Sequence, residues 1–89
     1  MDDERRLDGN AAAGVLREVF VFEMTTAEIA CVRCGSTGRV GGQMAYMHGM
    51  GVVVRCASCD NALIRVARGG GRCWLDLKGV KYLQIEEAR

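Results

Sequence analysis

Two Cys-x-x-Cys pairs constrain this chain of 89 residues more than any other feature of its sequence. The first pair lies in CVRCG, residues 31–35, and the second lies in CASCD, residues 56–60. Two such pairs are typical of a structural zinc site, where four thiolates surround the ion as a tetrahedron with Zn–S distances of about 2.3 Å. We therefore expect one structural zinc ion per chain, held by Cys31, Cys34, Cys56 and Cys59.

The residues after each pair suit the tight turn that would bring two thiolates to one ion. Gly35 can adopt positive φ without strain, and Asp60 and Asn61 tolerate that region better than most residues. Segments with strand character enter and leave each pair, so the metal would clamp two antiparallel β-hairpins together. The predicted fold class is therefore a small, mainly β zinc ribbon with one N-terminal amphipathic α-helix.

The length of the chain predicts a single domain, 1–89, with a core small enough to need a staple such as a metal. Its first residues, MDDERRLDGN, are acidic and polar and lack the apolar segment of a signal peptide. No apolar run approaches the roughly 20 residues of a membrane span. We therefore expect a cytoplasmic protein with no membrane partner, where cysteines bind metal or react more often than they form disulfides.

The pattern of apolar residues divides the domain into three parts. Residues 1–9 are predicted to form a flexible lead-in, residues 10–22 a helix capped by Asn10, and residues 26–85 the zinc-ribbon sheet. Helical spacing aligns one apolar stripe, which consists of Ala12, Val15, Leu16, Val19 and Phe20.

Two segments of the expected sheet bear on the packing of this helix. RVGGQMAYM at 39–47 is predicted as one strand weakened by its glycines, and CWLDLKG at 73–79 alternates with period two, placing Leu75 and Leu77 on one face. We expect the helix of a monomer to bury its stripe against this face. Alternatively, two chains share their helices in a homodimer. Residues 80–89 are predicted as a further strand or a short helix.

Charge is unevenly distributed along the chain. Residues 1–30 carry a net charge of −4 and residues 31–83 a net charge of +6, although the whole chain carries only +1. A zinc ion with four thiolates would lower the second value to about +4. The basic segment makes nucleic acid the alternative partner. Basic residues that simply face the solvent would explain the same charge without a partner. The candidate contacts are Arg65, Arg68, Arg72, Lys78 and Lys81, with Tyr46, Trp74 and Tyr82 for base stacking.

Other kinds of sulfur chemistry give further alternatives. A thiol redox protein is one, although neither pair precedes a helical pattern, and a rubredoxin-like iron centre uses similar spacing. His48 should lie at a hairpin tip roughly 25 Å from the metal end, and Cys73 is displaced similarly, so neither is expected to bind zinc. His48 with Met44, Met47 and Met50 could also form a Cu(I) site. The commoner role of methionine in such strands is to fill the hydrophobic core.

Signals of catalysis are weak in this sequence. No nucleophile has an obvious base, and GGG at 69–71 lacks the following helix and the Lys-Ser/Thr of a phosphate loop. Four cysteine ligands would also leave no open position on the zinc for a substrate. We predict that the protein is not an enzyme but a binding or adaptor module, which acts through an unknown protein partner in protein–protein interaction or regulation.

Several segments together resemble a family of small actinobacterial proteins that carry a domain of unknown function. The resemblance rests on LDGN at 7–10, LREVF at 16–20, EMTTA at 23–27, WLDLKG at 74–79 and the two cysteine pairs, and it covers nearly the whole chain. It implies a zinc-ribbon-like fold with the metal on the same four cysteines. It implies no established activity and no ligand role for Cys73 or His48.

Overall fold

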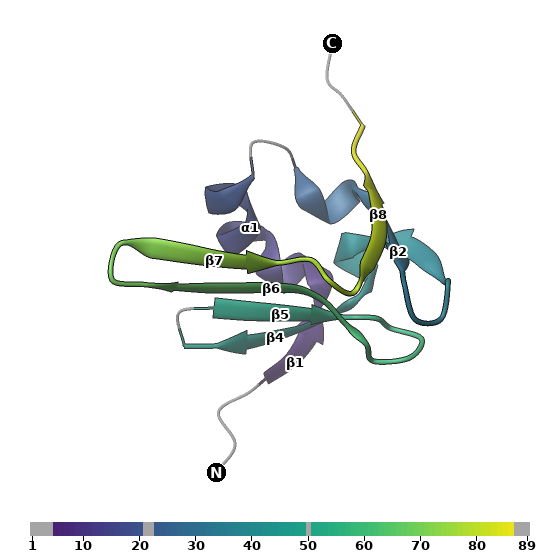
Figure 1. Ribbon diagram of the computed structural model, residues 1–89, viewed down its shortest axis with the longest axis horizontal. Helices are drawn as coiled ribbons and strands as arrows, with labels where there is room; N and C mark the ends of the chain where they lie inside the picture. The colour runs from purple at the N-terminus through teal and green to yellow at the C-terminus, as the bar shows by residue number, and fades with distance from the viewer. Residues whose placement is uncertain (1–4, 21–22, 50, 87–89) are drawn as a thin grey trace.

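The computed structural model of the protein describes residues 5–20, 23–49 and 51–86. These residues form eight strands in two antiparallel sheets and one short α-helix (Figure 1). The strands are β1 (Arg5–Asp8), β2 (Glu28–Cys31), β3 (Thr37–Arg39), β4 (Met44–His48), β5 (Gly51–Arg55), β6 (Ala62–Gly69), β7 (Arg72–Asp76) and β8 (Val80–Gln84). The helix is α1 (Ala13–Val19), and three 3₁₀ turns are η1 (Gly9–Ala12), η2 (Met24–Thr26) and η3 (Val40–Gly42). No helix of these described ranges has the length and apolar character that a membrane crossing requires.

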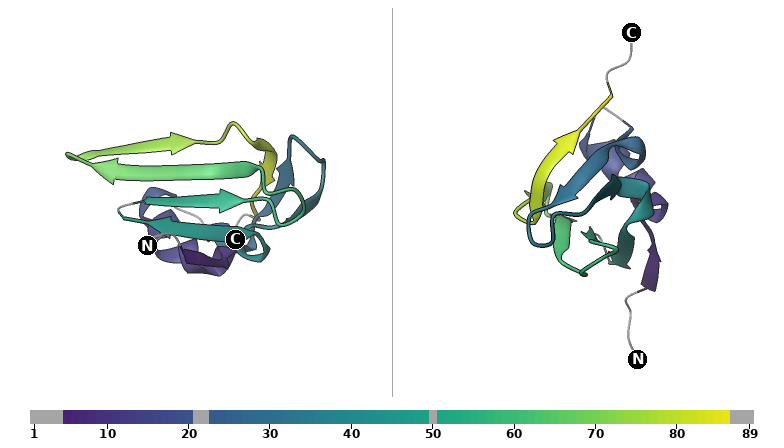
Figure 2. Two further views of the ribbon diagram at one scale, coloured as in Figure 1. Left: turned by 90° about the horizontal axis from the view of Figure 1, so that it is seen from below. Right: turned by 90° about the vertical axis from the view of Figure 1, so that its right-hand side faces the viewer.

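The larger sheet has five strands in the order β1-β4-β5-β6-β7, and the smaller has the order β3-β2-β8. The chain therefore starts in the larger sheet, passes through α1 into β2 and β3, returns for β4 to β7, and ends in the smaller sheet with β8. Figure 2 shows the smaller sheet at one end of the larger one. This topology makes the segment 26–85 two sheets rather than the single ribbon sheet that the sequence predicts.

Alternating burial gives the larger sheet an inner and an outer face. On β5, Val52 and Val54 are buried whereas Val53 is only half-buried, and on β6 Val66 is buried whereas Ala67 is exposed. We call the side of the buried residues the inner face and the opposite side the outer face. The inner face belongs to a single core, whose largest fully buried side chains are Leu16, Met24, Ile29, Leu63, Ile64, Val40, Val52, Val54 and Cys31.

The expected flexible lead-in is wrong for residues 5–8, which form β1 and pair with β4. The segment RRLD has no alternation that would predict a strand, so β1 depends on the backbone partners that the edge of β4 offers. Gly9 follows directly, and a Cβ there would collide with the carbonyl oxygen of Val40. The turn after β1 can therefore approach η3 only because residue 9 has no side chain.

The helix is shorter than the expected segment 10–22. Its α-helical part is α1, which ends with Phe20 in an extended conformation, and a 3₁₀ turn precedes it. Asp8 rather than Asn10 caps this turn, since its side chain accepts a hydrogen bond of 3.1 Å from the Asn10 N–H. Residues 21 and 22 lie outside the described part of the chain.

The chain itself covers the described side chains of the apolar stripe, which exclude that of Val19, but not with the contacts that the sequence predicts. Ala12 and Leu16 are fully buried, and Val15 and Phe20 pack against the core from partly buried positions. Leu77 also packs against the core, whereas Leu75 is 42% exposed. The helix expected to cover the face of Leu75 has only seven residues and is therefore only about 10 Å long. Because Ala12 and Leu16 are already buried within one chain, these two side chains do not need a second helix to cover them in a homodimer.

The expected strand over 39–47 is broken by η3, where the chain passes from the smaller sheet to the larger. Only glycine allows this crossing at position 41, because a Cβ there would collide with the side chain of Asn10 and lie 3.1 Å from the carbonyl oxygen of Thr25.

Near the C-terminal end of the described residues, residues 80–84 form a strand, which is the first of the two predicted alternatives. This strand, β8, pairs with β2 of the smaller sheet.

Leu16→Ala should lower the free energy of unfolding by about 2–5 kcal/mol, because it removes a fully buried side chain and leaves a cavity. Urea unfolding followed by circular dichroism measures this loss. Leu7→Ala is the matched control, since Leu7 is 38% exposed and should lose much less. Equal losses in the two variants would show that α1 does not anchor the core.

Candidate metal centre

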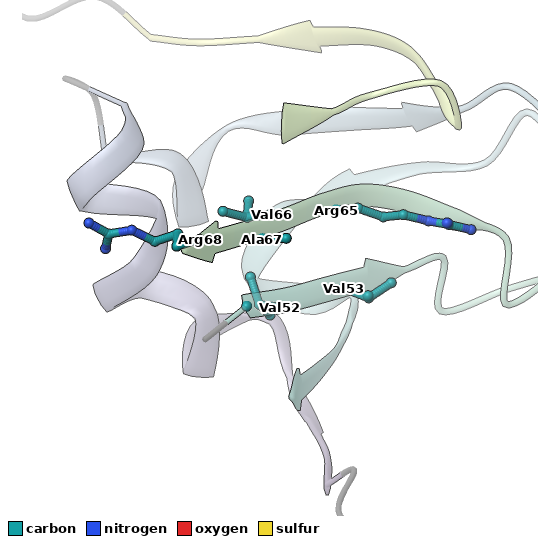
Figure 3. Close-up of a pocket in the computed structure, with 7 residues that line it drawn as sticks. Val52, Val53, Arg65, Val66, Ala67 and Arg68 are labelled. Carbon is teal, nitrogen blue, oxygen red and sulfur yellow. The ribbon is translucent and has the colours of Figure 1, made fainter. Parts of the chain in front are cut away.

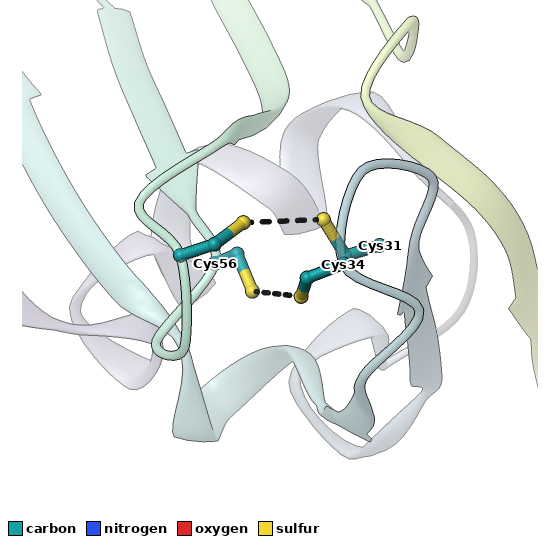
Figure 4. Close-up of side chains that lie close together, drawn as sticks. Cys31, Cys34 and Cys56 are labelled. Carbon is teal, nitrogen blue, oxygen red and sulfur yellow. Dashed lines mark hydrogen bonds between the residues drawn. The ribbon is translucent and has the colours of Figure 1, made fainter.

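The structure brings the four predicted cysteines together where the two sheets meet (Figure 4). Cys31 ends β2 of the smaller sheet, and Cys56 directly follows β5 of the larger sheet. The four Sγ atoms, including those of Cys34 and Cys59, all lie within 4.8 Å of one another. Residues from two sheets and from distant parts of the sequence therefore form one compact sulfur cluster.

Local hydrogen bonds shape the first cysteine turn. The Gly35 N–H donates to the carbonyl oxygen of Cys31 over 2.9 Å, and the Cys31 N–H donates to that of Ser36 over 3.0 Å. Gly35 has a φ of +77°, in the left-handed region that glycine adopts without strain. The predicted role of Gly35 is confirmed.

The second turn repeats this pattern with different residues. The Asp60 N–H donates to the carbonyl oxygen of Cys56, and the Cys56 N–H donates to that of Asn61, both over 2.8 Å. Asp60 has a φ of +67° and is the one non-glycine residue with positive φ in the described ranges, as its short polar side chain permits. The guanidinium of Arg55 also donates to the Asp60 carbonyl oxygen over 3.0 Å. The two turns thus present their cysteines in the same way.

The distances between sulfurs fit a metal and not a disulfide. Cys31 Sγ lies 3.7 Å from Cys59 Sγ, and Cys34 Sγ lies 3.7 Å from Cys56 Sγ. A disulfide would need about 2.05 Å. A tetrahedron with Zn–S bonds of about 2.3 Å has sulfur–sulfur edges of about 3.8 Å. Four thiolates in this arrangement suit zinc or iron, so the donor set fits a metal ion without selecting between these two.

Polar groups from both turns surround the sulfurs. The Ser36 hydroxyl lies 3.1 Å from Cys34 Sγ and 3.4 Å from Cys56 Sγ, so it bridges the turns. The Ser58 N–H donates to Cys56 Sγ over 3.4 Å. Such outer hydrogen bonds orient ligands and stabilise thiolate charge.

Asn61 connects the cluster to the loop between β7 and β8. Its side-chain amide donates to Cys31 Sγ over 3.5 Å and to the carbonyl oxygen of Gly79 over 3.4 Å. The same carbonyl accepts the Val32 N–H over 3.0 Å. A Cβ on Gly79 would collide with the carbonyl oxygen of Ala62, so only glycine allows this approach.

Gln43 supports the second turn from a buried position. Its Oε1 accepts the Ala57 N–H over 2.9 Å, and its Nε2 donates to the Arg39 carbonyl oxygen over 3.0 Å. The side chain is only 8% exposed, so both ends need these partners. Gln43 is not among the residues predicted from the sequence, where its only signal is a polar residue between two glycines and an apolar strand.

Burial and hydrogen bonding shift the pKa values of the cysteines in opposite directions. Burial raises the pKa of Cys56, but the Ser36 hydroxyl and backbone N–H groups of the turn outweigh it and lower this pKa to about 6. For Cys59, the Asn61 N–H lowers the pKa, but burial and hydrogen bonds with the other three cysteines raise it to about 12. Four thiolates so close together need a compensating cation, which a divalent metal would supply.

The other predicted sulfur and imidazole candidates lie elsewhere. The backbone of His48 pairs with Gly51 at the end of β4 and β5 that is farther from Cys56, and Cys73 is exposed on β7 opposite Arg68. Of the methionines proposed for Cu(I), Met44 is half-buried opposite Arg55 and Met47 packs against the core opposite Val52. Met50 lies outside the described residues. The two described methionines are thus three residues apart on β4, which places them on opposite faces of the strand rather than together at one site.

The candidate nucleic-acid contacts are divided between the two sheets. The sites on β6 and β7 and the loop after them are Arg65, Arg68, Arg72 and Lys78, whereas Lys81 lies on β8, and all five are exposed. Trp74 is 58% exposed on β7. The guanidinium of Arg55 lies 5.6 Å from the centre of the Tyr46 ring, and the Tyr82 hydroxyl donates to Glu28 Oε2 over 2.9 Å. Within the described residues, the larger sheet therefore combines exposed arginines with an exposed indole on neighbouring strands.

Comparison with known proteins gives a family but no activity. The chain matches, over residues 2–88, the sequence model of a family described as a family of unknown function (DUF6510). No curated protein and no solved structure matches the chain significantly. Because the match covers nearly the whole chain, the protein belongs to the family DUF6510.

Proposed function

We propose that the protein is a non-catalytic binding or adaptor module organised by one structural zinc ion on Cys31, Cys34, Cys56 and Cys59. The observation that carries this proposal is the convergence of four Sγ atoms within 4.8 Å from two turns of the same geometry. Two cysteine turns on antiparallel hairpins around one ion are what a zinc ribbon requires. A full set of four thiolates leaves no open position for a substrate, which favours a structural ion.

A role in protein–protein interaction or regulation, in the cytoplasm, is the second part of the proposal. Large apolar side chains project into solvent at several places, with exposures of 57% for Val32, 58% for Trp74, 42% for Leu75 and 43% for Tyr82. Exposed aromatic and aliphatic groups of this kind are common anchors in protein interfaces. In this proposal the metal ion stabilises the fold, and the exposed side chains contact the protein partner.

Removal of the metal should unfold the protein. Structural zinc contributes about 10–16 kcal/mol in zinc-finger peptides, which equals or exceeds the whole stability of a typical small domain. Circular dichroism before and after addition of a strong chelator, and again after zinc is restored, measures the effect. A metal-free chain that stayed folded would contradict a structural role.

Cys34→Ser should lose the metal or bind it weakly, whereas Cys73→Ser should retain one ion per chain. Cys34 is exposed, so its replacement disturbs the core little and mainly removes a ligand. Cys73 is also exposed but lies on β7, outside the sulfur cluster, and is therefore the matched control. Elemental analysis of both purified variants gives the result, and loss of metal from the Cys73 variant would overturn the ligand assignment.

Nucleic acid is the second candidate partner, on the evidence of a hollow between β5 and β6. This hollow of about 300 Å³ is lined by Val53, Ala67 and neighbouring residues, and the side chains of Arg65 and Arg68 extend from it toward opposite ends of β6 (Figure 3). Trp74 pairs with Ala67 across the strands. Arg65, Ala67 and Trp74 share the outer face, whereas Arg68 extends toward the C-terminal end of β6. An apolar floor beside an exposed indole, with a guanidinium group toward each end, suits an unpaired base with its flanking phosphates.

If this partner is correct, affinity for a single-stranded oligonucleotide should fall steeply with salt. Replacing Arg65 and Arg68 together by Ala should reduce the slope of log K against log salt by about 1.4, the value for two phosphates on a single strand. Arg33→Ala with Arg39→Ala removes two exposed arginines near the smaller sheet and should leave the slope unchanged. Fluorescence anisotropy over a salt series measures both, and no binding at low salt would exclude this candidate.

A further inference from the structure

Strand β7 forms one edge of the larger sheet and pairs, within the described part of the chain, with β6 alone. Figure 2 shows it at the margin of that sheet. Arg72, Cys73, Trp74 and Leu75 are all exposed, and Trp74 and Leu75 project from opposite faces because neighbouring side chains in a strand alternate. Natural edge strands are usually protected, so an edge with exposed apolar groups on both faces indicates a partner.

The sequence of this edge, Arg-Cys-Trp-Leu-Asp, is complementary to itself when two copies run antiparallel. With the two Trp74 residues opposite each other, Cys73 of each copy faces Leu75 of the other, and Arg72 faces Asp76. Opposite residues in an antiparallel pair lie on the same face of the sheet. The pairing would therefore place two ion pairs and a tryptophan pair on the outer face, and two Cys–Leu pairs on the inner face.

We propose that the protein forms a two-fold symmetric dimer in which the β7 strands pair antiparallel, centred on Trp74. The two five-stranded sheets then become one continuous sheet. This interface is distinct from the helices and from the sulfur cluster, so it neither requires nor excludes the proposed metal function.

The charges that would face each other across the dimer favour a centre at Trp74 over the neighbouring centres at Cys73 and Leu75. Two-fold pairing must match residues of the same face, so the centre moves by whole residues along the strand. Centred on Cys73, the pairing would set Arg72 against Trp74 and Asp76 against Gly70. Centred on Leu75, it would set Arg72 against Lys78, two like charges. Among these three, only the Trp74 centre places each charged residue of β7 opposite the contrary charge.

The surroundings of Asp76 support the same register. Asp76 lies opposite Arg65 across β6 and β7, and its Oδ1 accepts the Lys78 N–H over 2.8 Å, which fixes the carboxylate at the end of the strand. In the dimer this carboxylate would lie between Arg65 of its own chain and Arg72 of the second copy. The arrangement would place one carboxylate between two guanidinium groups on the outer face.

Complementary charge reversal tests the proposal directly. Arg72→Asp leaves β7 with two acidic ends and Asp76→Arg leaves it with two basic ends, so each variant should dimerise roughly tenfold or more weakly than the unmodified chain. An equimolar mixture of the two variants should restore dimerisation, because each chain then faces the opposite charge at both positions. Sedimentation equilibrium measures the association, and recovery in the mixture also shows that both variants are folded.

Two further readouts make the test specific. Trp74 is the only tryptophan, so its emission should shift to shorter wavelength as the unmodified chain dimerises. Lys81→Asp, on β8 in the other sheet, changes charge by the same amount as Arg72→Asp and should dimerise like the unmodified chain. Metal content should be equal in all variants, which separates this proposal from the zinc proposal. A chain that remains monomeric at high concentration, a mixture that fails to recover, or a dimer that readily forms a Cys73–Cys73 disulfide would overturn the proposal.

Discussion

The contact between the two cysteine turns organises this structure, because each turn belongs to a different sheet. Cys31 and Cys34 lie in the β2–β3 connection, and Cys56 and Cys59 lie in the β5–β6 connection, so both sulfur–sulfur distances of 3.7 Å span the two sheets. Four thiolates at this separation repel one another unless a cation lies between them. A bound metal ion would therefore do two things at once: it would hold the two sheets in their relative position, and it would neutralise the charge of the thiolates.

The cysteine cluster could be predicted from the sequence because metal ligation depends on residue type and spacing, both of which are local. The positive φ values at Gly35 and Asp60 could be predicted for the same reason. Strand β1 could not, because RRLD acquires strand structure only by pairing with β4. The break at η3 was also missed, since it depends on the contact between Gly41 and Asn10, thirty-one positions apart in the numbering.

The groups that support the cluster were beyond prediction from this sequence. Gln43 holds the second turn from a position thirteen residues before Cys56, and Gly79 accepts hydrogen bonds at the cluster because the β7–β8 loop folds back onto Ala62. Nothing in their local sequence encodes these contacts. The exposed Leu75 illustrates the same limit, because a period-two pattern shows which residues share a face but not whether another element covers that face.

X-ray absorption at the metal edge, on protein purified from its native source without added metal, tests the central claim most directly. The account predicts zinc with four sulfur neighbours at about 2.3 Å and no nitrogen or oxygen in the first coordination sphere. Fewer than four sulfurs, or a nitrogen ligand, would contradict the proposed set of cysteines. A folded protein with no metal to measure would contradict the idea that an ion joins the two sheets.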